Sequence, residues 1–272
     1  MGRIDSSARV ADGARLGADV EIGPFCIVGP DVELGDGVRL HPNVHITGRT
    51  RIGPRTVIYP FASLGSPPQS VRYKGEPSRL LIGADCVLRE NVTMSPGTAG
   101  GRMETRVGDR GIFMVGAHVG HDCIVGDDVT FANMASLGGH VEIGSWAFMG
   151  ALSGVHQFTR VGEHALIAAV CGVAKDVIPF ASAIGVRARL AGLNMVGLKR
   201  REFSGEALHA LRAAYRMLFF GPGHLLERAD QVSVKFAGNP HVERIVEFVR
   251  TAKKRHIATP RAGRTRDEDY DE

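Results

Sequence analysis

Four histidines in the second half of the sequence are the residues best suited to chemistry. They are His118, His121, His140 and His156, and Asp122 directly follows His121. One of these imidazoles can act as a general base whose orientation is set by the neighbouring carboxylate. Alternatively, several neutral imidazoles can bind Zn²⁺ or a similar ion and leave one position open for water. The residue types alone leave both chemistries open.

A six-residue repeat predicts the scaffold that positions these histidines. Mostly aliphatic residues recur every six positions between Val10 and Val173, often followed by glycine. This period fits neither a helix nor a hairpin sheet, and it is typical of a parallel β-helix in which three hexads close one coil. His121, His140 and His156 are separated by 19 and 16 residues, each close to the length of one coil. We therefore expect them to gather near one edge of a three-sided prism.

The repeat loses its phase twice, over residues 66–81 and over residues 100–106. Loops that interrupt a rigid scaffold often carry binding residues. We therefore expect an all-β, left-handed parallel β-helix over residues 1–190 with loop insertions at these two places. The left-handed winding is taken from the class of hexapeptide solenoids.

The pattern becomes helical after the repeat ends. Ser204 can cap a helix that Gly221-Pro222-Gly223 ends, a second helix is expected from about His224 to Phe236, and Asn239-Pro240 has the form of a third helix start. Residues 191–252 are thus predicted to form a small α-helical C-terminal domain. The charged tail over residues 253–272 is predicted to be disordered.

Composition excludes several function classes. Of 272 residues, 35 are glycine and only 6% are aromatic, which suits many tight turns. A formal charge of +4 is too small to indicate a nucleic-acid partner. The longest apolar run, at 165–174, is too short for stable membrane insertion. Four widely spaced cysteines suggest small buried side chains in a reducing, cytoplasmic compartment.

Several motifs together resemble the UDP-N-acetylglucosamine O-acyltransferase family, which opens lipid A synthesis in Gram-negative bacteria. The resemblance covers about residues 4–250 and rests on Gly-Pro-Phe-Cys-Ile-Val-Gly-Pro at 23–30, Tyr-Lys-Gly-Glu-Pro at 73–77, and the segments 118–122, 155–158 and 197–201. It implies a homotrimer with active sites between subunits. Each site would transfer a 3-hydroxyacyl group from acyl carrier protein to the 3-position of the nucleotide sugar, with no cofactor beyond the carrier's phosphopantetheine thioester and no metal.

The resemblance also implies residue roles. His121 matches the general base, Asp122 the residue that supports it, and the Gly139 N–H the donor to the thioester oxyanion. These roles suit a base near neutral pKa and a fixed donor for charge that develops in the transition state. The remaining matches are substrate-binding positions, namely Gln69, Ser70, Arg72, His118, His140, His156, Gln157, Asn194, Arg200 and Arg201. Lys199, Arg200 and Arg201 with Arg212 and Arg216 would form a basic surface for an acidic carrier protein.

Departures from the family pattern affect specificity. Ser70 and Arg72 stand where the family commonly has Asp and Lys, Ser95-Pro96 replaces the usual His-Arg, and Val196 replaces a common acidic residue. Loss of a carboxylate at Ser70 raises the alternative of a 3-amino acceptor sugar. Ala169 occupies the position of the acyl-chain ruler, where a glycine often admits a longer chain, so we expect a shorter limit.

Two readings from other classes remain. One is a trimeric β-helix enzyme similar to carbonic anhydrase, with three metal-binding histidines from neighbouring subunits. The other is a hexapeptide scaffold without catalytic activity.

Overall fold

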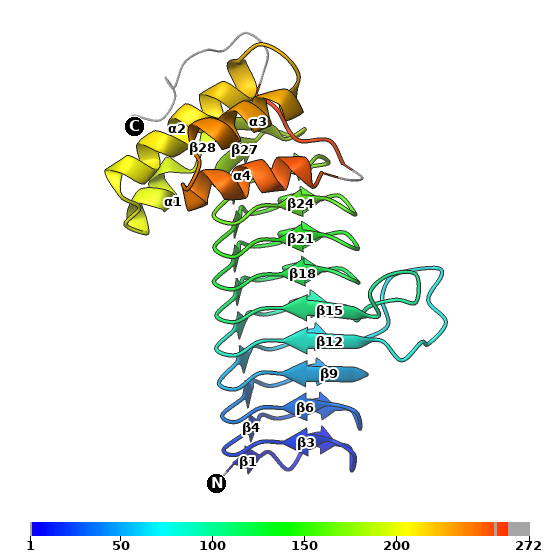
Figure 1. Cartoon of the computed structure of the whole chain (residues 1–272). Coiled ribbons are helices and arrows are strands. Elements are labelled where there is room, and N and C mark those ends of the chain that lie inside the picture. The colour runs from blue at the N-terminus through cyan, green and yellow to red at the C-terminus, as the bar shows by residue number, and fades with distance from the viewer. Residues whose placement is uncertain (1, 253–254, 261–272) are drawn as a thin grey trace.

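The hexad residues line the inside of a three-sided prism. The structure is a computed structural model that describes residues 2–252 and 255–260. Most strands contain two residues, of which the first points outward and the second inward, as in Val57–Ile58. Ile22, Leu40, Ile58 and Leu88 follow one another along one side and are at most 3% exposed. The prism carries a small group of helices at its C-terminal end (Figure 1), as the sequence predicts.

Each side of the prism is a sheet of parallel strands, apart from one antiparallel pair at the end of the first side. The first side contains β1 (Arg3–Ile4), β4 (Glu21–Ile22), β7 (Arg39–Leu40), β10 (Val57–Ile58), β13 (Val87–Leu88), β16 (Ile112–Phe113), β19 (Thr130–Phe131), β22 (Phe148–Met149), β25 (Leu166–Ile167), β27 (Ala181–Ile184) and β28 (Arg189–Leu193). The second side contains β2 (Arg9–Val10), β5 (Ile27–Val28), β8 (His45–Ile46), β11 (Ser63–Leu64), β14 (Thr93–Met94), β17 (His118–Val119), β20 (Ser136–Leu137), β23 (Gly154–Val155) and β26 (Gly172–Val173). The third side contains β3 (Arg15–Leu16), β6 (Glu33–Leu34), β9 (Arg49–Ile52), β12 (Arg79–Ile82), β15 (Glu104–Val107), β18 (Ile124–Val125), β21 (Glu142–Ile143) and β24 (Arg160–Val161).

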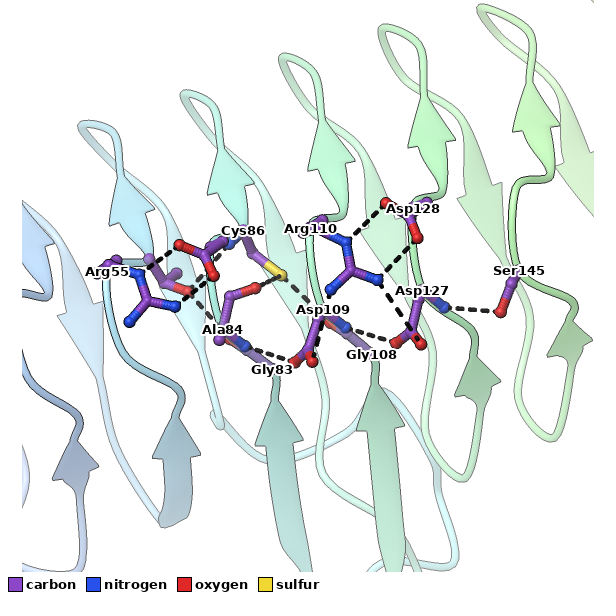
Figure 2. Close-up of polar contacts among 12 residues, drawn as sticks. Arg55, Gly83, Ala84, Cys86, Gly108, Asp109, Arg110, Asp127, Asp128 and Ser145 are labelled. Atoms are coloured by element: carbon purple, nitrogen blue, oxygen red, sulfur yellow. Dashed lines mark hydrogen bonds and ion pairs between the residues drawn. The ribbon is translucent and has the colours of Figure 1, made fainter. Parts of the chain in front are cut away.

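The chain turns three corners in every coil. We call them the first corner, between the first and second sides, the second corner, between the second and third sides, and the third corner, between the third and first sides. Many turns place one residue in the left-handed backbone region, for example Arg55 (φ 58°) and Asp85 (φ 56°) at the third corner. The Arg55 guanidinium, labelled in Figure 2, donates two hydrogen bonds, of 2.7 and 2.6 Å, to the Asp85 carboxylate. Side chains at equivalent positions of successive coils therefore contact one another.

Both interruptions of the repeat leave the prism at the second corner. One loop, 65–78, joins β11 to β12, and the other, 95–103, joins β14 to β15; both project to the same side of the prism (Figure 1). The predicted insertions extend to residues 81 and 106, but the loops end before them. Strands β12 and β15 begin two residues earlier than the hexads suggest, and Leu80 and Thr105 there point inward and are fully buried. A six-residue period cannot show this, because these positions lie outside the hexads.

The four cysteines are free and buried, as expected. Burial raises the pKa of Cys86 to about 11 and that of Cys123 to about 12. These thiols remain protonated at neutral pH and act as small apolar side chains.

Four helices follow the prism in the described part of the chain. They are α1 (Met195–Arg200), α2 (Gly205–Phe220), α3 (Leu225–Lys235) and α4 (Pro240–Arg250). The predicted caps are confirmed, because Ser204 accepts a hydrogen bond from the Ala207 N–H and Asn239 accepts from two N–H groups at the start of α4. Helix α1 has no counterpart in the sequence prediction because its six residues are too few for a helical period. Among the described helices, none is long and apolar enough to cross a membrane.

The predicted disorder of the tail is wrong for residues 255–260. The Asp176 N–H donates to the His256 carbonyl (2.9 Å), and the Ala258 N–H donates to the Asp176 carbonyl (2.8 Å). Ile257 and Ala258 are 7% and 0% exposed. The composition of the whole tail conceals this short apolar pair, which packs against the end of the prism. The rest of the predicted tail, 253–254 and 261–272, lies outside the described residues.

Candidate active site

The second corner brings two of the predicted histidines into contact with Asp122. Asp122 lies in the turn after β17, and His140 occupies the equivalent position one coil later, with φ values of 60° and 62°. The His121 and His140 rings meet edge to face with centroids 5.0 Å apart, and the His140 ring stacks on Phe158 at 4.3 Å. His140 Nε2 lies 3.9 Å from Asp122 Oδ2. The near-coil spacing in the sequence therefore gathers these side chains at one corner.

Asp122 is fully buried, and both of its carboxylate oxygens are occupied. Oδ2 accepts a 2.6 Å hydrogen bond from the Thr98 hydroxyl and lies 2.8 Å from His121 Nδ1. Oδ1 accepts from the backbone N–H groups of Thr98 (3.1 Å) and Arg102 (2.6 Å). Burial alone would raise the pKa of Asp122, but these hydrogen bonds, led by Thr98 and His121, outweigh it and hold the pKa below its usual range.

The ionised carboxylate determines the state of His121. An ionised carboxylate accepts hydrogen bonds only, so the neutral imidazole donates its Nδ1–H to Asp122. Its Nε2 atom then carries the lone pair. The His121 side chain is 21% exposed, so a ligand can reach the ring. The pair has the arrangement of a general base held by a carboxylate.

The loop 95–103 forms the cover over Asp122. A Cβ added at Gly101 would lie 2.3 Å from the Asp122 carboxyl carbon, so the loop backbone packs directly on this group. Arg102 donates from Nη1 to the Asp122 carbonyl (2.9 Å), and Thr105 accepts the Asp122 N–H (2.8 Å). Sequence reasoning missed the roles of Thr98, Arg102 and Thr105. The available signals are Gly97-Thr98, just before the predicted second interruption, and the position of Arg102 and Thr105 within it.

Gly139 lies beside Nε2 of His121, the nitrogen that Asp122 does not use. A Cβ at this position would lie 2.5 Å from His121 Cε1 and 2.6 Å from Nε2, so any side chain would displace the imidazole. Within the part of the chain that the structure describes, no backbone hydrogen bond from the Gly139 N–H is seen. A base and a backbone donor thus share one small region of the corner.

The remaining predicted histidines lie on either side of this pair. His118 is on β17, where its Nδ1 is 2.7 Å from the Thr93 hydroxyl. Burial, followed by the proximity of His121, lowers the pKa of His118, which favours the neutral imidazole. His156 and Gln157 are exposed at the second corner, in the turn that also contains Phe158.

The predicted sugar-binding residues of the first interruption lie in the loop 65–78. Gln69 and Arg72 are exposed, and Ser70 is half-buried. The loop contacts the cover over Asp122, because the Glu76 carboxylate accepts the Ala99 N–H at 3.0 Å. The two loops therefore lie side by side at the second corner.

Other predicted residues lie at different corners. Asn194 is 4% exposed, caps α1 and donates from its amide to the His164 carbonyl (2.9 Å). Arg201 donates to the Trp146 carbonyl (3.0 Å) and lies over the Trp146 ring at the third corner, and burial lowers its pKa. Arg200 is exposed beside it, whereas Ala169 is exposed at the first corner. One chain does not bring these residues to His121.

Three of the atoms that could bind a metal ion at this corner, both Asp122 oxygens and His121 Nδ1, already form hydrogen bonds. Ligand atoms of His121, Asp122 and His140 lie within 4.8 Å of one another in a single chain, whereas the metal alternative expects three histidines from neighbouring subunits. However, each Asp122 oxygen already has two hydrogen-bonding partners, and His121 Nδ1 is used by Asp122. A metal ion would have to displace these contacts, so the arrangement suits proton transfer better.

The prism of hexapeptide coils places the chain among the hexapeptide-repeat proteins, and sequence profiles identify the class as bacterial transferases. The bacterial transferase hexapeptide profile matches residues 13–48 and 31–66, and a profile for domain 2 of UDP-N-acetylglucosamine O-acyltransferase matches residues 176–258.

Similar proteins define the family. A relative from Azorhizobium caulinodans, named acyl-[acyl-carrier-protein]--UDP-N-acetylglucosamine O-acyltransferase, is 56% identical over 98% of this chain and 98% of its own. A relative of the same name from Thiobacillus denitrificans is 50% identical over 93% and 98%. A crystal structure of UDP-N-acetylglucosamine acyltransferase matches with a TM-score of 0.93 at 38% identity, covering 96% of this chain and all of that one. The chain belongs to the UDP-N-acetylglucosamine O-acyltransferase family, and the left-handed β-helix is confirmed.

Proposed function

We propose that the protein transfers a 3-hydroxyacyl group from acyl carrier protein to the 3-hydroxyl of UDP-N-acetylglucosamine, the step that opens lipid A synthesis. The observation that carries this proposal is the His121–Asp122 pair beside the Gly139 backbone. Relatives named for this activity match almost the whole chain.

The proposed reaction needs one base and one oxyanion donor. His121 Nε2 takes the proton of the sugar hydroxyl, and the oxygen attacks the thioester carbonyl carbon. The Gly139 N–H donates to the oxyanion that forms in the transition state. When the carbon–sulfur bond breaks, the imidazolium returns the proton to the departing thiolate, while Asp122 stabilises the charged ring. The steps need no added cofactor or metal.

The distribution of the predicted residues supports a site between copies of the chain. His121 and Gly139 lie at the second corner, Arg201 at the third and Ala169 at the first. One substrate could contact all of them only if corners of different copies met. We therefore propose a homotrimer with its active sites at these junctions, acting in the cytoplasm.

The helical end of the molecule suits the acyl carrier protein. Lys199, Arg200, Arg212 and Arg216 are all exposed there. Such a basic surface would attract an acidic partner and lose that attraction as salt is added.

Two details of specificity remain predictions. Ser70 and Arg72 lie in the loop beside the cover over Asp122, where a change from the family pattern would affect the choice between a 3-hydroxyl and a 3-amino sugar. Ala169 is proposed to limit acyl length, and Ala169→Gly should extend the accepted chain.

The test is a product assay with a panel of 3-hydroxyacyl carriers and both UDP-sugars, read by mass. Loss of a general base should lower kcat by about 10² to 10⁴-fold in His121→Ala. His45→Ala, on β8 of the same side, is the matched control. If His121→Ala keeps wild-type turnover, or no acyl transfer occurs with any pair, the proposed function is wrong.

A further inference from the structure

A residue of the C-terminal segment contacts the second corner. Arg255 Nη2 lies 2.7 Å from His156 Nδ1, and the same guanidinium donates from Nε and Nη2 to the Gln157 carbonyl, at 3.2 and 3.0 Å. These contacts join positions 98 and 99 residues apart in the chain. The family motifs in the sequence assign no role to this arginine.

The contact determines which nitrogen of His156 carries the proton. A guanidinium has donors only and stays charged in proteins, so the nitrogen that faces it must supply a lone pair. His156 Nδ1 also lies 3.2 Å from the Gln157 carbonyl, which can only accept. The guanidinium contact is shorter, at 2.7 Å, and that carbonyl already accepts from Arg255 Nε and Nη2. We therefore assign Nδ1 as the acceptor, so that in the neutral ring Nε2 carries the hydrogen. Because His156 is exposed, its Nε2–H is available as a donor to a bound molecule.

The segment that carries Arg255 is fixed to the prism by several contacts. Ile257 pairs with Asp176 and Pro260 pairs with Leu190, each as a parallel bridge. The Asp176 carboxylate in turn accepts hydrogen bonds from the Arg160 N–H (2.9 Å) and Nε (2.8 Å) on β24, next to the turn of His156. The backbone that carries Arg255 is thus anchored through Asp176 to β24, the strand that follows the turn of His156.

We propose that Arg255 is a positioning residue for substrate binding, which fixes the His156 ring and tautomer so that Nε2–H donates to an oxygen acceptor of a substrate. This inference rests on the proposed function. The acceptor belongs to either the UDP-sugar or the phosphopantetheine arm, and separate measurements for the two substrates distinguish them.

The first experiment measures steady-state kinetics of Arg255→Ala, Arg255→Lys and the control Arg187→Ala, an exposed arginine outside the site. Loss of one oriented hydrogen bond should raise the KM of one substrate about tenfold, while kcat changes less than twofold. Arg255→Lys should recover part of this effect, because lysine is also a donor without acceptors. In a His156→Phe background, Arg255→Ala should have no further effect. Unchanged KM values for both substrates, or additive effects in the double variant, would overturn the proposal.

The second experiment does not depend on turnover. Nitrogen NMR of protein labelled with [¹⁵N]histidine, assigned by comparison with His156→Phe, reports which ring nitrogen is protonated. The wild type should show a single tautomer at His156, and Arg255→Ala should show a mixture. An unchanged tautomer in Arg255→Ala contradicts the proposal even if the enzyme is active. Failure of acyl transfer together with the expected change in tautomer would instead locate the error in the proposed function.

Discussion

The second and third corners of the prism place an aspartate in the same backbone position and use it differently. Asp122 and Asp128 have φ values of 60° and 55°. At the third corner, Asp128 accepts two 2.8 Å hydrogen bonds from Arg110, whose side chain is 51% exposed, in a row of charged residues that includes Asp109 and Asp127 (Figure 2). At the second corner, Asp122 is covered by a loop and faces an imidazole. The coil supplies the position, and the groups that cover it decide the chemistry.

The largest effect is expected from neutralising Asp122, with neutralisation of Asp128 as the comparison. Asp122→Asn should lower kcat by about 10² to 10⁴-fold, because an amide cannot stabilise the imidazolium and favours the wrong tautomer. Asp128→Asn should leave kcat near the wild-type value, since Asp128 pairs with the Arg110 guanidinium and supports no imidazole. Steady-state assays of both variants measure the difference, and equal losses would refute the distinction between the corners.

The cover over Asp122 can be tested with two adjacent glycines. Gly101→Ala would place a methyl group 2.3 Å from the carboxyl carbon, whereas Gly100→Ala meets no atom within 4 Å. Gly101→Ala should therefore displace the loop and reduce kcat at least tenfold, and Gly100→Ala should have little effect. Assays at matched protein concentration, with melting curves for both variants, test this expectation. If both variants are fully active, the loop does not support the carboxylate.

The Thr98 hydroxyl should affect stability in a pH-dependent way. Its hydrogen bond lowers the pKa of Asp122, so its contribution is fully present above the ordinary value of 3.8 and is lost as pH falls through the lower folded pKa. Thr98→Val should reduce the free energy of unfolding by about 1.5 to 3 kcal/mol at pH 7, with a smaller difference in strong acid.

Urea unfolding at several pH values measures this effect, and Thr98→Ser, which keeps the hydroxyl, is the control. A Thr98→Val loss that stays constant down to strong acid would show that packing, rather than the carboxylate, accounts for it.

The smallest effect is expected at the third corner. Arg110→Gln removes an ion pair whose arginine is half exposed, so the free energy of unfolding should fall only slightly, and by less still at high salt. Thermal melts at low and high salt provide the measurement. A loss that salt leaves unchanged would indicate that Arg110 acts through packing.

The periodic part of the molecule could be predicted from the sequence, and the irregular part could not. Each hexad forms the same strand and turn, so the three sides of the prism and the contact between His121 and His140 can be predicted from residue spacing alone. Thr98 and Arg102 reach Asp122 through a loop without a period, and no spacing indicates which of its atoms turn inward. The position of Arg255 depends on the burial of Ile257 and Ala258 against Asp176, which lies about 80 residues earlier in the chain. Composition does not reveal such a tertiary contact. The sequence predicted Asn194 as a substrate contact but gave no sign that its side chain also caps α1.

The pairing of strands continues without slippage across both loops. Ser63 pairs with Thr93, and Thr93 pairs with His118, although more chain separates these partners than separates Arg3 from Glu21. The length of a loop inserted at a corner therefore does not affect the pairing of the strands on either side of it. Insertions or deletions in these loops can therefore change the surroundings of the second corner while His121 and His140 keep their spacing along the prism.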